Sequence, residues 1–174
     1  GSLFPDFESV IAVNSLSKTM GISGWRIGYV LAKPEFIQEL LVLNQHLVTC
    51  APTILQLYLA EHFNEIHTAT YPQAQKINAK RKKVETLLSE AGIETAEGSS
   101  TFYIFLNLEN YTDDAYALAD QLLKNHNIAM VPGSAYGQST KSYLRMSIGV
   151  ESIERISIAI NVLKNILANG EYYT

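Results

Sequence analysis

The stretch NSLSKTMGISGWRIGY, residues 14–29, carries the information that decides the fold of this chain. It follows the apolar run 10–13, which predicts a short buried strand, and it leads into a second apolar run, 27–32, which predicts another. The loop between them is rich in glycine and serine and contains Lys18 and Arg26. Lysine and arginine are rarely buried without a partner, and ligands of α/β folds bind where strands end. The pattern therefore predicts a ligand-binding loop.

The residue types of this loop fit a phosphorylated aldehyde. A neutral lysine amine attacks aldehydes to form Schiff bases, and partial burial of Lys18 would favour the neutral amine. Ser15, Ser17 and the forked guanidinium of Arg26 could bind a phosphate group. Pyridoxal 5′-phosphate (PLP) would satisfy the whole set. The alternative is a solvated Lys18 on a glycine-rich loop, with Arg26 in an ordinary surface ion pair.

The spacing of these residues resembles the lysine segment of fold-type I PLP enzymes, specifically the class I/II aminotransferases of the aspartate aminotransferase superfamily. Those proteins have Ser-x-Ser-Lys, a glycine loop and Gly-x-Arg-x-Gly, as residues 15–18 and 24–28 have here. The resemblance implies that Lys18 forms the Schiff base with PLP and that Ser15 and Arg26 bind its phosphate, with Ser17 in a supporting role. It also implies transfer of an amino group from an amino acid to a 2-oxo acid.

A second arginine lies late in the chain. Arg145 alternates with the apolar Leu144 and Met146, which predicts a strand over 143–148. The segment resembles the family's Arg-x-Ser element, whose arginine binds the substrate α-carboxylate through two parallel hydrogen bonds. The alternative is an arginine on the exposed face of an edge strand. Residues 132–137 resemble the family's Pro-Gly-x-x-Phe-Gly turn, for which we expect only a structural role.

Periodicity predicts the remaining elements and the domain organisation. Helices are expected over 34–48, 53–63, 71–91 and 151–168, with another capped by Thr112, and strands over 102–108 and 128–131. The expected fold class is α/β, as the C-terminal part of the PLP-transferase fold. In that fold, 3–33 would be a remnant of the large PLP-binding domain (two strands plus the lysine loop). Residues 34–70 would be connecting helices, and 71–170 the small α+β domain.

The resemblance runs from Val10 to Ala168 but covers only the C-terminal part of the family's usual length. In the family, the N-terminal half supplies the glycine turn for the phosphate, the aromatic residue that stacks on the cofactor ring and the aspartate that pairs with the ring nitrogen. Residues 3–13 contain no credible counterpart of that aspartate. We therefore expect a fragment with little activity alone, which forms a homodimer or needs a missing N-terminal half.

Other functions stay open at this point. The chain could be another fold-type I enzyme, such as a lyase or synthase, a non-catalytic interaction module, or a structural fragment that needs a partner. A net charge of −4 argues against nucleic-acid partners, and we expect no membrane partner because no apolar run is long enough to span a bilayer. His62 and His67 are five residues apart, which is not a standard zinc spacing, so no metal is expected. The single cysteine, Cys50, cannot form an internal disulfide, and we expect a cytoplasmic protein.

Overall fold

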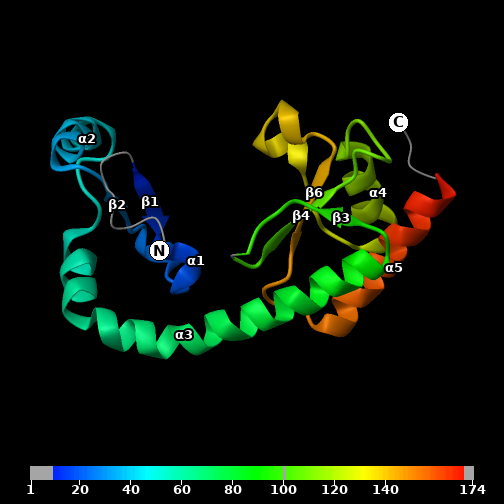
Figure 1. Ribbon diagram of the computed structural model, residues 1–174, viewed down its shortest axis with the longest axis horizontal. Helices are drawn as coiled ribbons and strands as arrows, with labels where there is room; N and C mark the ends of the chain where they lie inside the picture. The colour runs from blue at the N-terminus through cyan, green and yellow to red at the C-terminus, as the bar shows by residue number, and fades with distance from the viewer. Residues whose placement is uncertain (1–9, 100, 171–174) are drawn as a thin grey trace. The chain divides into compact units, whose positions relative to one another are not determined.

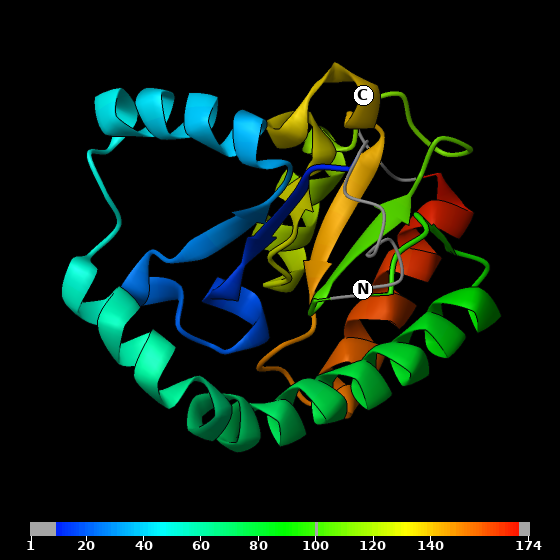
Figure 2. The same cartoon turned by 60° about the vertical axis from the view of Figure 1, so that its left-hand side comes forward.

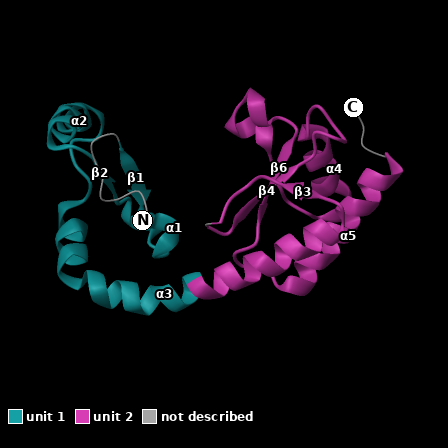
Figure 3. Ribbon diagram, viewed as in Figure 1, with its two compact units in different colours: residues 1–74 teal, residues 75–174 magenta. Residues whose placement is uncertain are grey.

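A computed structural model describes residues 10–99 and 101–170 (Figure 1). The chain divides into two compact units, residues 1–74 and residues 75–174 (Figure 3). Each unit has its own cluster of buried apolar side chains. Helix α3, Thr53–Glu90, contributes residues to both units.

Unit 1 is built around a two-stranded antiparallel hairpin. Strand β1 (Ala12–Ser15) pairs with β2 (Gly28–Leu31), and the short helices α1 (Leu16–Thr19) and η1 (Ser23–Trp25) lie in the connection between them. The two predicted strands are therefore confirmed, but the prediction that they are buried is wrong. Val13 is 76% exposed, because a two-stranded sheet has no further layer to cover its faces. Helix α2, Pro34–Leu47, likewise contains no buried residue.

The two helices predicted over 53–63 and 71–91 form one element. Helix α3 continues through the segment between them, with a local break at His62, where φ is −109° and ψ is 20°. Pro72 lies inside the helix although proline cannot donate a backbone hydrogen bond. Two residues before Pro72, the hydroxyl of Thr70 donates to the carbonyl of Ile66 at 2.8 Å. The predicted helix end at residue 63 therefore lies next to the kink at His62, whereas residues 64–70, for which no helix was predicted, are helical as well.

Unit 2 is a four-stranded antiparallel sheet with the order β3-β4-β6-β5. One face is covered by helices α4 (Tyr116–His126), α5 (Ile153–Asn169) and the second part of α3 (Figure 2). The strands are β3 (Glu94–Thr95), β4 (Tyr103–Asn107), β5 (Val131–Pro132) and β6 (Tyr143–Ser147). Along β4 and β6, alternate residues enter the core and include Ile104, Leu106, Leu144 and Met146. The residues between them lie on the opposite face of the sheet.

Several element ends differ from the sequence prediction. Thr112 does not cap α4: its hydroxyl accepts a hydrogen bond from the backbone of Asp114, and the carboxylate of Asp114 accepts one from the backbone of Tyr116, where the helix begins. Strand β3 was not predicted, and β5 shares only Val131 with the strand predicted over 128–131, because residues 128–130 are not in a strand. The predicted helix stops are confirmed, because Gly92 and Gly170 have φ values of 77° and 64°, which glycine adopts easily.

Candidate functional site

The predicted cofactor residues lie at one end of the β1–β2 hairpin. Ser15 is the last residue of β1, pairs with Gly28 of β2 and caps helix α1 by accepting a hydrogen bond from the backbone of Ser17 at 3.2 Å. Lys18 lies in the same helix, and Arg26 lies two residues before β2. The backbone N–H of Leu16 donates to the carbonyl of Ile27 at 3.3 Å, which ties the two sides of the connection together. The structure therefore gathers these residues in one closed loop.

A small apolar cluster holds this loop in place. Leu16, Met20 and Ile27 are buried together with Leu59 of helix α3, and Trp25 packs against them. Leu16 and Met20 are four residues apart, so both project from the same side of α1 and its C-cap. Lys18 lies between them in the sequence and is exposed. The alternation of apolar and polar residues in the quoted stretch thus anchors the loop and leaves the amine on its outer side.

Arg26 has a backbone conformation that is uncommon for a residue with a side chain. Its φ is 55°, in the left-handed region, and its Nη1 donates to the carbonyl of Ser23 at 2.8 Å. A non-glycine residue in this region costs about 1–3 kcal/mol, so the surrounding contacts must hold it there. The guanidinium thus contacts the backbone of its own loop. It forms no ion pair with any carboxylate among the described residues.

Arg145 lies in unit 2, on the face of the sheet opposite the helices. Strand β6 is central rather than at an edge, and Arg145 is paired with Phe105 of β4 and Val131 of β5. The Cζ of Arg145 lies 4.2 Å from the ring centroid of Tyr103 and 5.3 Å from that of Tyr136. Its Nε is buried and has no hydrogen-bond partner in the part of the chain that the structure describes.

Sequence reasoning did not predict the contacts of Arg145 with Tyr103 and Tyr136. Tyr136 lies in the 3-10 turn η2 (Gly133–Tyr136), for which only a turn-forming role was expected. Arg81 of helix α3 was also missed: it is 5% exposed and donates to the carbonyl of Tyr103. The burial of Arg81 could have been predicted from the sequence, because Arg81 has helical spacing to Val84 and Leu88 and lies on the same buried face of the helix.

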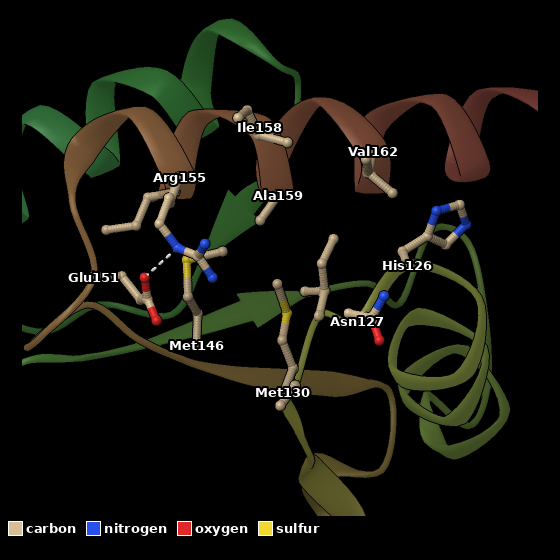
Figure 4. Close-up of a pocket in the computed structure, with 12 residues that line it drawn as sticks. His126, Asn127, Met130, Met146, Glu151, Arg155, Ile158, Ala159 and Val162 are labelled. Carbon is tan, nitrogen blue, oxygen red and sulfur yellow. Dashed lines mark hydrogen bonds and ion pairs between the residues drawn. The ribbon is translucent and has the colours of Figure 1, made fainter.

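A pocket of about 450 Å³ lies between helix α5 and the segment that follows α4 (Figure 4). Met130 and Met146 contribute to its wall, and Arg155 at its rim is already paired with Glu151 at 2.5 Å. None of the predicted site residues lines this pocket. Within residues 10–99 and 101–170, no three His, Cys, Asp or Glu side chains come together as a metal site, and no helix is long and apolar enough to cross a membrane.

Comparison with known proteins settles the family. The sequence profile for aminotransferase class I and II matches residues 3–163, which is most of the chain. The chain belongs to this family. This chain is 28% identical over 163 residues to an aspartate aminotransferase of Pyrococcus abyssi. It is 31% identical over 163 residues to a (5-formylfuran-3-yl)methyl phosphate transaminase of Methanocaldococcus jannaschii.

These alignments cover 92% and 93% of this chain but only 42% and 43% of the two relatives. The structure is also similar to the crystal structure of an aromatic aminotransferase from Pyrococcus horikoshii, with a TM-score of 0.76 and 28% identity over 96% of this chain and 45% of that one. The predicted fold, part of the PLP-transferase fold, is therefore confirmed. The chain spans less than half the length of these relatives.

Proposed function

We propose that this chain contributes the cofactor lysine and the substrate arginine of a PLP-dependent aminotransferase. Class I and II aminotransferases generally depend on PLP and act on amino acids and 2-oxo acids. The observation that supports the proposal is the gathering of Ser15, Lys18 and Arg26 at one end of the β1–β2 hairpin. In this proposal residues 3–33 belong to the large cofactor-binding domain, 34–70 connect, and 71–170 form the small domain.

The donor set of the loop fits PLP, which carries a phosphate and an aldehyde on a pyridine ring. Arg26 and Ser15 would bind the phosphate through a guanidinium and a hydroxyl, with Ser17 in support, and Lys18 would bind at the aldehyde carbon. When bound, the group supplies an electron sink for the bond that breaks at the substrate α-carbon.

Two side chains of this chain would then act on the substrate. Arg145 would bind the α-carboxylate in two parallel hydrogen bonds and so fix the orientation of the amino acid. The Lys18 amine would move a proton between the substrate α-carbon and the aldehyde carbon of the cofactor, first as a base and then as an acid. Association with a second copy of the chain, or with an N-terminal half that supplies the remaining cofactor contacts, would complete the site.

The proposal can be tested without measuring turnover. The full chain is incubated with PLP and reduced with borohydride, and the modified lysines are identified by mass spectrometry of peptides. We expect modification concentrated at Lys18, absent in Lys18→Ala and unchanged in the matched control Lys33→Ala, which alters another exposed lysine of unit 1. Arg26→Ala should require more PLP for the same modification, whereas Arg26→Lys should retain part of the affinity because the positive charge remains.

Inorganic phosphate provides a second control. If Arg26 and Ser15 bind the cofactor phosphate, added phosphate should compete with PLP for Lys18 in the wild-type chain and have less effect in Arg26→Ala. Modification spread evenly over the exposed lysines, with Lys18 no more reactive than Lys33, would contradict the proposal.

A further inference from the structure

The guanidinium of Arg145 is oriented without a hydrogen bond at its Nε. This atom is buried and unpartnered among the described residues, although a buried donor normally has an acceptor. What contacts the guanidinium instead is aromatic: the ring of Tyr103 at 4.2 Å and the ring of Tyr136 at 5.3 Å. Both separations lie within the range of a cation–π interaction.

The two rings come from different elements, and both elements are anchored. Tyr103 begins strand β4 and faces Ser147 of β6, so it lies diagonally across the ladder from Arg145, within reach of a long side chain. Its carbonyl accepts a hydrogen bond from the buried guanidinium of Arg81. The backbone of Tyr103 is thus held from the helix side of the sheet, while its ring lies on the opposite face.

Tyr136 is held by its turn and by a neighbouring ring. The hydroxyl of Thr140 donates to the carbonyl of Gly133, the first residue of η2, at 2.8 Å. The ring of Tyr136 also meets the ring of Phe105 edge to face, with centroids 5.6 Å apart. Because Phe105 is the direct cross-strand partner of Arg145, this contact places Tyr136 beside the guanidinium.

We propose that Tyr103 and Tyr136 are positioning residues that hold the plane of the Arg145 guanidinium, so that its fork meets a substrate carboxylate in a fixed orientation. The inference rests on the carboxylate-binding role proposed for Arg145. It adds that the orientation comes from two aromatic faces rather than from a hydrogen bond at Nε. The two rings therefore contribute to affinity for a carboxylate although they do not bind it.

The experiment uses the full chain labelled with ¹⁵N and ¹³C, and NMR signals of the arginine side chains. In the wild type, the ring currents of two tyrosines should shift the Arg145 signals away from those of solvated arginines. Pyruvate is the probe, as a minimal 2-oxo acid, and sodium chloride at equal ionic strength is the control. Pyruvate should move the Arg145 signals further with a measurable Kd.

Four variants separate positioning from a general structural effect. Tyr103→Leu and Tyr136→Leu should return the Arg145 signals towards solvated values and raise the Kd for pyruvate roughly 2- to 30-fold. Tyr136→Phe keeps the ring, so it should leave the Arg145 signals and the Kd for pyruvate at their wild-type values, because the aromatic face and not the hydroxyl contacts the guanidinium. Tyr116→Leu, at an exposed position on helix α4, should change neither. Tyr136 is 49% exposed in a turn, so its variants should fold even if Tyr103→Leu does not.

The outcomes distinguish this inference from the function on which it rests. Wild-type Arg145 signals that do not respond to pyruvate would overturn the carboxylate-binding role of Arg145 and, with it, the positioning role of the two tyrosines. A wild-type response that persists unchanged in Tyr136→Leu would overturn the positioning role alone and leave the carboxylate site intact. Equal losses in Tyr136→Leu and Tyr136→Phe would also overturn it, because the aromatic face would then not be the group that acts.

Discussion

Replacing Arg81 by methionine tests the contact that fixes the strand beside Arg145. The guanidinium is 5% exposed and donates to the carboxylate of Glu85 at 2.7 Å, to the carbonyl of Gly98 at 3.0 Å and to the carbonyl of Tyr103. Methionine keeps much of the apolar stem but has no donor. We expect unit 2 to be destabilised and the loop before β4 to loosen.

The size of the expected stability loss depends on how exposed each hydrogen-bond partner of Arg81 is. A hydrogen bond from a charged donor contributes about 1.5–3 kcal/mol, which would give roughly 3–6 kcal/mol for the two carbonyls. Gly98 is exposed, so water can replace its lost donor, whereas Tyr103 is only half-buried and will be partly rehydrated. Glu85 is 35% exposed, and its ion pair adds no more than about 1 kcal/mol. The expected loss is therefore about 2–4 kcal/mol in the free energy of unfolding.

Urea denaturation followed by far-UV circular dichroism measures this loss. With a dependence of about 1–3 kcal/mol per molar urea for a unit of this size, the urea midpoint should fall by roughly 0.7 to 4 M. The only tryptophan in the sequence, Trp25, lies in unit 1, so its fluorescence transition serves as an internal control that should not move. Lys82→Met, at the exposed neighbouring position, should change stability by less than about 0.5 kcal/mol.

One result would refute this reasoning. If Arg81→Met shifted the midpoint no more than Lys82→Met, the buried guanidinium would not stabilise unit 2, and its hydrogen bonds to the two carbonyls would be no stronger than those to water. Loss of the Trp25 transition at the same urea concentration would instead show that the effect is not confined to unit 2.

Three further predictions concern unit 2. Gly133→Ala would place a Cβ 1.8 Å from the carbonyl oxygen of Thr140, so we expect a loss of at least about 2 kcal/mol in urea denaturation. Asn127 ends α4 with φ of 55°, so Asn127→Val should lower stability by about 1–2 kcal/mol in thermal unfolding, whereas Asn127→Gly should not. The pKa of Glu154 is lowered because its carboxylate accepts hydrogen bonds from the Glu154 backbone N–H and from the side chain of Ser152. Ser152→Ala should therefore raise the pKa of Glu154 in an NMR titration. Because the folded-state pKa is lowered, the stability from this carboxylate is present at neutral pH and is lost as the pH falls through that pKa.

The sequence by itself predicted the two strands and the loop of residues 14–29 and most of the other elements. Ser15, Lys18 and Arg26 are close in the chain, and three of the four buried apolar residues that anchor their loop, Leu16, Met20 and Ile27, belong to the same stretch. Most of this arrangement therefore follows from local strand and turn chemistry, whereas the fourth, Leu59, comes from helix α3. The alternation around Arg145 likewise placed it on a strand, and glycines marked two helix ends correctly. Local rules are sufficient where the contacts that decide the structure are local.

Only the tertiary structure decided what surrounds Arg145. Tyr103 and Tyr136 are 42 and 9 residues away from it in sequence, and they meet it because β4 and β6 pair in one register and η2 folds back beside them. The hydrogen bonds that Arg81 donates to the carbonyls of Tyr103 and Gly98 have the same origin. These features depend on which segments pack together, and a pattern within one segment contains no information on its distant partners.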